Sequence, residues 1–395
     1  MAFTPLRREE RSEWRGMLAP VENTRVLAAV LMFVFSSLTL VFCQSMTVAS
    51  IFLLYAVFFY YTLSRSISSL LLLALPGVFL MPISAYCAGI SYAMALPAAY
   101  AALLLGSVCG AFAILQLYRS KRQCVLLALL PIALYIVSYF VCGSARLSLL
   151  VLLPSAAAVV LALCVLYCRP LTPSVLTVTA ALAVLALATI LISMHAYGTL
   201  TGNPVRAMVE LLRLGVQRIF DTAIKMNAAE GMALPITDTD VRNLAAVLGN
   251  LAPALFLVCC MLLAHAMWRM LMRMMLEWQM LPRMPVRLAV LTISPVAAMV
   301  FAAAFLLSLL LNTEELTPFG MLCENLSLLL EPPLVLVGFS SLSPRRATSC
   351  LSQALAVGLI LLLLVNLSLG LSLAACLGAF YILWSHFAPR DKGEK

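Results

Sequence analysis

Apolar runs of nearly membrane-spanning length recur from residue 24 to the C-terminus, separated by short segments that carry basic residues. A helix needs about 20 apolar residues to cross the hydrocarbon core of a bilayer. Only helices and closed barrels satisfy their backbone hydrogen bonds there. The runs are rich in Leu, Ala, Val and Met and do not alternate with polar residues, which argues against barrel strands. The sequence therefore predicts an all-α, polytopic transmembrane helical bundle of about 10–12 helices.

The composition agrees with this class and excludes others. Hydrophobic residues make up 64% of the chain and charged residues 10%, with a formal net charge of +9. The basic residues stand at the ends of apolar runs and form no aromatic-laced patch, so nucleic acid is not an expected partner. Most of the 12 cysteines lie inside apolar runs without zinc or redox spacing. We interpret them as buried hydrophobes, and we expect no metal and no cofactor.

The apolar runs divide the chain into predicted spans and a few extramembrane pieces. The candidate spans are 26–43, 47–63, 67–83, 93–117, 124–142, 147–168, 174–197, 246–268, 288–311, 319–342, 349–366 and 369–387. The predicted organisation is a cytoplasmic tail (1–25), N-terminal transmembrane helices (26–198), an extramembrane amphipathic segment (199–245), C-terminal transmembrane helices (246–389) and a second tail (390–395).

The basic residues also predict the orientation. If the N-terminus is cytoplasmic, most of the 25 Lys and Arg residues fall in cytoplasmic segments, as the positive-inside rule requires. A multi-pass protein of the cell membrane with both termini in the cytoplasm fits best. Membrane lipid is then an obligatory partner.

The segment 199–245 has polar residues at helical spacing opposite an apolar face. Two interpretations stay open. The helix lies on the bilayer surface or on the rim of the bundle, or it forms a lid over a substrate cavity.

The span 319–342 contains the residues with the clearest chemical potential. Glu324 and Glu331 stand seven residues apart, which places them on one face of a helix about 10 Å apart. Pro332 and Pro333 directly follow Glu331 and should break or kink the helix. Ionisable groups inside a membrane are costly and face a partner or a cavity. Glu331, with Glu324 and Asn325, is therefore the predicted substrate-binding site; a water-facing Glu324 and a merely structural kink at Glu331 are the alternatives.

Two further patterns concern packing and docking. Small residues repeat at helical spacing in Gly106–Gly110 and in Gly370, Ala374 and Gly378, which favours close helix contacts within the chain or with another subunit. The basic turn 267–287 is interpreted as an anchor at the headgroup level or as a docking surface. The predicted docking residues are Arg269, Arg273, Arg283 and Arg287.

No catalytic motif is present: the chain has no HExxH, no Walker A sequence, no GxSxG and no dinucleotide fingerprint. We therefore predict no catalytic residues and no enzyme activity. Without an ATP site, transport would need an ion gradient, other membrane subunits or a separate ATPase module.

Residues 200–390 resemble the YybS-like family of predicted bacterial membrane proteins, a domain of unknown function. The elements that carry the resemblance are Val205–Lys225, Asn250–Leu251–Ala252–Pro253–Ala254, Arg269–Arg273, Leu281–Pro282–Arg283–Met284–Pro285, Asn325 and Leu377–Gly378. The family is grouped with substrate-binding subunits of energy-coupling-factor transporters, which implies a transport role. The chain departs from it at Glu331–Pro332–Pro333, in its closing residues Tyr381–Phe387 and in having more spans than a six-helix subunit.

The leading functional hypothesis is thus a transport-related protein, a substrate-binding or permease-like subunit for a small solute. The alternative is a non-transporting membrane scaffold or partner protein in cell-envelope processes.

Overall fold

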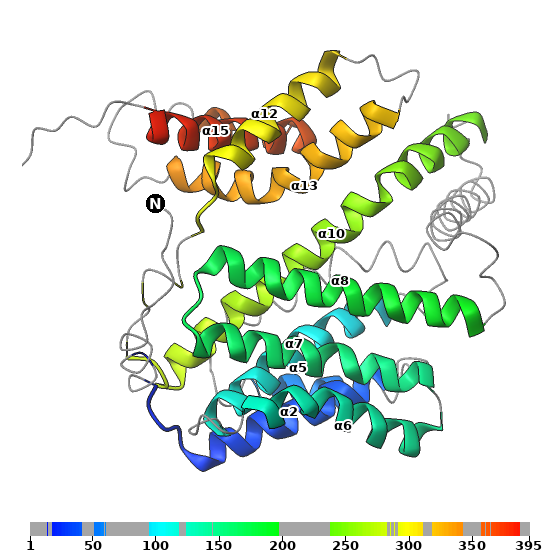
Figure 1. Ribbon diagram of the computed structural model, residues 1–395, viewed down its shortest axis with the longest axis vertical. Coiled ribbons are helices and arrows are strands. Elements are labelled where there is room, and N and C mark those ends of the chain that lie inside the picture. The colour runs from blue at the N-terminus through cyan, green and yellow to red at the C-terminus, as the bar shows by residue number, and fades with distance from the viewer. Residues whose placement is uncertain are drawn as a thin grey trace, which may run out of the picture. The chain divides into compact units, whose positions relative to one another are not determined.

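In the computed structural model, the part of the chain that the structure describes contains helices and no strand (Figure 1). This part comprises residues 14, 18–41, 51–58, 60, 95–117, 124–143, 145–196, 238–282, 285, 288, 291–310, 318–342, 357–359, 361–363 and 365–387. Its long helices are α2 (Asn23–Val41), α5 (Ala95–Leu117), α6 (Cys124–Cys142), α7 (Ala145–Leu166), α8 (Leu171–Ala196), α10 (Asp238–Glu277), α12 (Pro295–Leu310), α13 (Pro318–Ser341) and α15 (Leu367–Phe387). The all-α prediction is confirmed.

Six of these helices are long and apolar enough to cross a bilayer: α2, α5, α8, α10, α13 and α15. The surfaces of five of them, α5 being mostly buried, support the same conclusion, because large apolar side chains are exposed along them. Phe380 and Trp384 of α15, for example, are 63% and 65% exposed. Water-soluble proteins rarely leave such extended apolar surface uncovered. The protein is therefore an integral, multi-pass membrane protein.

Several helix boundaries differ from the predicted spans, and two of the larger differences have a local cause. Helix α12 begins at Pro295 because Ser294 caps it: the Ser294 hydroxyl accepts a hydrogen bond of 3.1 Å from the amide of Ala297. Helix α10 extends well past residue 268 because its last turns are buried. The predicted helices at 67–83 and at 199–237 lie outside the described residues.

The described residues form two compact units. Unit 1 contains the middle of α10 (Asn250–Val258) together with α12, α13 and α15. Unit 2 contains α2, α5, α6, α7 and α8 together with the two ends of α10.

In unit 2, helices α2 and α7 both pack against α5 at its glycines. A Cβ at Gly110 would lie 2.8 Å from Cδ2 of Phe33 and 3.0 Å from Cβ of Ala158. Gly106 similarly faces Ser36 of α2 and Pro154 of α7. The Gly106–Gly110 element therefore mediates packing within the chain.

One end of unit 2 gathers the termini of several helices, and we name it the cap (residues 14, 18–22, 112–116, 165–169 and 267–281). The Trp14 indole donates a hydrogen bond of 2.8 Å to the carbonyl of Val165. The Val21 amide donates to the side chain of Gln116, and the Ala19 amide donates to the carbonyl of Met280. Segments predicted to share the cytoplasmic side of the membrane thus meet at one end of unit 2.

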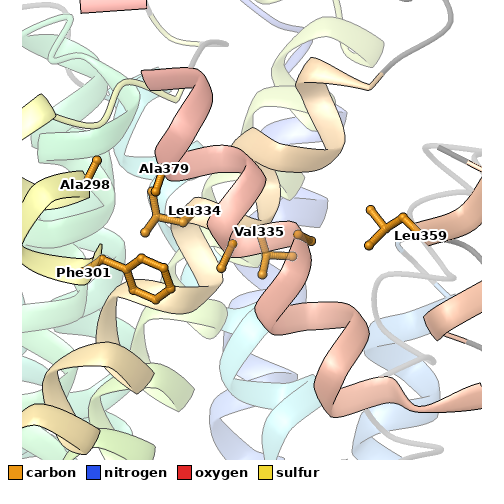
Figure 2. Packing of buried hydrophobic residues seen from close by; sticks show 8 residues of the cluster. Ala298, Phe301, Leu334, Val335, Leu359 and Ala379 are labelled. Atoms are coloured by element: carbon orange, nitrogen blue, oxygen red, sulfur yellow. The ribbon is translucent and has the colours of Figure 1, made fainter. Parts of the chain in front are cut away.

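In unit 1, helices α12, α13 and α15 enclose an apolar core. Figure 2 shows Phe301 of α12, Leu334 of α13 and Ala379 of α15 within it, and Phe301 and Leu334 are at most 2% exposed. Asn366 begins α15 as its N-cap, because its side-chain oxygen accepts a hydrogen bond of 3.1 Å from the Leu369 amide.

Candidate functional site

Glu331 lies in the interior of α13 and is hydrogen-bonded across to α15. The hydroxyl of Ser372 donates to Oε1 of Glu331 at 2.9 Å. Both side chains are half-buried. A carboxylate in an apolar helix requires such a partner, because an unsatisfied charge away from water is costly. Among the described residues, no second hydrogen bond is formed with this carboxylate, so one of its oxygens is available to another ligand.

The two prolines after Glu331 do not end α13, which runs without interruption from Pro318 to Ser341. Of the two predicted effects, a break or a kink, the break does not occur. Neighbouring turns stay helical because α13 packs along α15 and α12 in unit 1. Proline still has no amide hydrogen, so the carbonyl groups of Leu328 and Leu329 lose their usual donors at Pro332 and Pro333. Two backbone acceptors are thus freed within one turn of Glu331.

Glycines let α13 and α15 approach closely near this pair. A Cβ at Gly338 would overlap the carbonyl oxygen of Ala374, and a Cβ at Gly378 would overlap that of Leu334. Helix backbones come this close only where side chains are absent. The small-residue stripe of α15 therefore serves a contact within the chain, and this contact brings Ser372 to Glu331.

Glu324 shares the helix with Glu331 but not its environment. It is half-buried, and its own backbone carbonyl accepts a hydrogen bond of 3.0 Å from the Ser327 hydroxyl. No ion pair or hydrogen bond of its carboxylate is found in the described part of the chain. The spacing of seven residues places the two carboxylates about 10 Å apart along α13, which is too far for them to share one small ligand.

Asn325 is engaged with α10. Its side-chain nitrogen donates to the carbonyls of Asn250 at 3.1 Å and Met321 at 2.8 Å. Its side-chain oxygen accepts a hydrogen bond of 3.3 Å from the Ala254 amide. These contacts use both amide hydrogens, so Asn325 has little capacity left for a solute.

Of the predicted docking residues, Arg269 and Arg273 are exposed at the C-terminal end of α10, whereas Arg283 and Arg287 lie outside the described residues. The Arg269 guanidinium donates to His265 at 3.5 Å. Many of their neighbours in the sequence are buried, including Trp268, Met270 and Trp278. These two tryptophans pack inside the protein and do not project from its surface. Trp268 instead donates to the carbonyl of Leu288, and Trp278 meets the Phe112 ring edge-on at 4.7 Å.

Ser372 was not predicted as a partner of Glu331. The available signal was a hydroxyl group next to the small-residue stripe of α15, but the sequence has many similar serines. Only the crossing of α13 and α15 distinguishes this one.

Within the described residues, no three His, Cys, Asp or Glu side chains come together as metal ligands.

No protein-family model matches this chain, and no curated protein or solved structure is significantly similar to it. The functional argument therefore rests on the residues themselves.

Proposed function

We propose that this integral membrane protein is a transport-related subunit, substrate-binding or permease-like, that captures a small polar or cationic solute at Glu331. The supporting observation is the half-buried carboxylate inside α13, held by the Ser372 hydroxyl at 2.9 Å with one oxygen available. Ionisable groups at such positions are commonly part of substrate or ion pathways.

The groups around Glu331 favour a cationic ligand. The carboxylate, the Ser372 hydroxyl and the carbonyls freed by Pro332 and Pro333 all offer oxygen atoms. Hard cations prefer oxygen ligands, and an ammonium group would donate its hydrogens to the same atoms. The Ser372 hydroxyl now donates to Glu331, but it can rotate and accept instead, since a hydroxyl both donates and accepts.

Helix movement would admit and release the solute. Transporters place their sites beside helices with interrupted backbone hydrogen bonding, and neighbouring helices rock about the site. In α13 the helix itself is continuous, but two backbone hydrogen bonds are missing because Pro332 and Pro333 have no amide hydrogen. In this proposal the energy comes from an ion gradient or from a separate ATPase module, and the chain itself performs no catalysis.

The resemblance of residues 200–390 to the YybS-like family points in the same direction, through the grouping of that family with substrate-binding subunits. It stays a prediction. The Glu331 proposal stands on the geometry of α13 and α15 and does not depend on it.

The direct test uses the full-length protein purified in detergent and reconstituted in liposomes. Thermal unfolding is followed with NaCl, KCl, ammonium salts and small organic amines at constant ionic strength, and uptake of any stabilising ion is then measured. We expect one cation class to raise the midpoint for the native protein. Glu331→Gln should abolish this increase, and Ser372→Ala should reduce it.

Ser385→Ala is the matched control, because Ser385 lies on the same helix and its hydroxyl donates only to the Ile382 carbonyl of its own turn. It should leave the cation effect unchanged. If Glu331→Gln and Glu331→Leu both keep the full stabilisation and uptake, Glu331 is not the binding site.

A non-transporting scaffold in the cell envelope is the second candidate, and the exposed Arg269 and Arg273 favour it. They stand on a cap that hydrogen bonds and buried tryptophans hold rigid. A rigid basic surface suits an acidic partner.

Photo-crosslinking residues placed at 269 and 273 separate the two candidates. Leu262, exposed on the same helix within the span, is the control position. Recovery of envelope proteins from 269 and 273 but not from 262 would favour the scaffold. Recovery of ATPase subunits would favour transport.

A further inference from the structure

Pro253 interrupts the hydrogen bonding of α10, although the helix continues from Asp238 to Glu277. Proline has no amide hydrogen, and its ring pushes against the carbonyl one turn earlier. The backbone next to Pro253 is therefore the place where α10 is most easily opened or bent. This place lies inside the apolar stretch Gly249–Glu277, which is long enough to cross the bilayer.

The side chain of Asn325 reaches this opening from α13. In an α-helix, the Ala254 amide would donate to the Asn250 carbonyl. Here Asn325 contacts both groups: its oxygen accepts from the Ala254 amide at 3.3 Å, and its nitrogen donates to the Asn250 carbonyl at 3.1 Å. One carboxamide thus bridges the donor and the acceptor that flank Pro253.

The orientation of the carboxamide is determined by its partners. Its nitrogen faces two carbonyls, those of Asn250 and Met321, and its oxygen faces one amide hydrogen. The reversed orientation would set an NH₂ group against an amide donor and an oxygen against carbonyl oxygens. The bond to Met321, one turn earlier on α13, also holds the side chain in position.

We propose that Asn325 is a latch that holds a proline hinge of α10 in one conformation. The carboxamide ties the Ala254 amide and the Asn250 carbonyl to α13, next to the Gly249 carbonyl that loses its usual donor at Pro253. Without it, this weakened turn is held only by the hydrogen bonds of α10 itself. The helix would then change its bend at Pro253 or sample several bends. This assigns Asn325 to conformational control and not to solute binding, and it holds whether or not Glu331 binds a cation.

The test is a double-mutant cycle on the full-length protein with Asn325→Ala, Pro253→Ala and both together. Spectroscopic labels at Val247 and Leu262, both exposed on α10 on either side of Pro253, report the bend through their distance distribution. Labels carried by non-natural amino acids avoid the native cysteines. Thermal unfolding is measured on the same samples.

We expect Asn325→Ala to shift or broaden the distance distribution and to lower the unfolding midpoint. Alanine at 253 restores an amide hydrogen and removes the ring, so in the Pro253→Ala background the same substitution should lose most of both effects. Asn325→Leu, which keeps much of the side-chain volume but has neither donor nor acceptor, should shift the distance distribution as Asn325→Ala does.

Two results would overturn the latch. One is an effect of Asn325→Ala of equal size in both backgrounds, which would mean that Asn325 only fills space. The other is an unchanged distance distribution in Asn325→Ala. If Asn325→Ala does not fold, the cycle is run with Asn325→Leu, and the same two outcomes decide.

Discussion

The two units each contain a helix crossing built on glycines, yet the two crossings differ in what the glycines meet. In unit 2, Gly106 and Gly110 face side chains of α2 and α7, such as the Phe33 ring and the Ala158 methyl group. In unit 1, Gly338 and Gly378 face backbone carbonyl groups of the opposing helix. Side chains can adjust by changing rotamer, whereas a helix backbone moves only as a whole.

The unit 2 crossing is a packing contact, whereas the unit 1 crossing also positions the polar side chains of the candidate site. The unit 2 crossing buries apolar surface and small hydroxyls that bond within their own helix, such as Ser107 to Leu103. The unit 1 crossing holds a hydroxyl on α15 beside a carboxylate on α13. A backbone-to-backbone contact suits that task because it sets the helix separation with little freedom.

The largest expected effect is at Gly338. Gly338→Ala places a methyl group on the Ala374 carbonyl, and α13 and α15 must separate. We expect a loss of about 3 kcal/mol in unfolding free energy, at the high end for overpacking, measured by denaturant titration in detergent micelles. Cation stabilisation through Glu331 should weaken as well. An unfolding free energy equal to that of the native protein would show that the close approach is not structurally required.

Gly110→Ala should cost less, about 1.5 kcal/mol, in the same titration. The added methyl group meets the Phe33 ring, which can turn aside, and the Ala158 methyl group, which cannot. The cation response should stay native, because Gly110 belongs to the other unit. A cost larger than that of Gly338→Ala would reverse the comparison between the two crossings.

Ser372→Ala should lower the free energy of unfolding by about 1 kcal/mol, the usual value of a hydrogen bond. The effect stays this small because Glu331 is only half-buried. The measurement is the unfolding midpoint with and without the stabilising cation. We expect the cation response to fall by a larger share than the stability. A response that stays intact while stability falls would restrict Ser372 to a structural role.

Ser107→Ala should have the smallest effect, below about 0.5 kcal/mol. The serine hydroxyl bonds to a carbonyl of its own helix at 2.7 Å, and that carbonyl already has a helical partner. Alanine also has the higher helix propensity. The unfolding midpoint and the cation response of this variant should both match those of the native protein. A clearly lower midpoint would indicate that the Ser107 hydroxyl interacts with a neighbouring helix.

The positions of the helices could be predicted from the apolar runs. The predicted span 124–142 coincides with α6, and 319–342 nearly coincides with α13, because a bilayer-crossing helix must be apolar over a set length. Helix ends that depend on tertiary burial were not readable. The sequence MWRMLMRMMLE looks like the start of a basic turn, but α10 continues through it because its methionines and Trp268 are buried in the cap.

The candidate site was predicted in part. Glu331 was identified from a charge inside an apolar span, a local signal. Ser372 and the role of Asn325 depend on α13 meeting α15 and α10, which are distant in the sequence. Of the predicted break or kink at Pro332–Pro333, the break does not occur, because packing against neighbouring helices outweighs the local loss of hydrogen bonds.

The apolar runs alone were enough to predict a helical membrane protein and to identify the helix that contains the half-buried carboxylate of Glu331. Both follow from the cost of placing polar backbone or charge in hydrocarbon, and that cost depends on each segment alone. The tertiary structure decided which hydroxyl meets the carboxylate and which helix the Asn325 amide joins. Those pairings depend on how closely two helices approach, and that distance is set by residues from both.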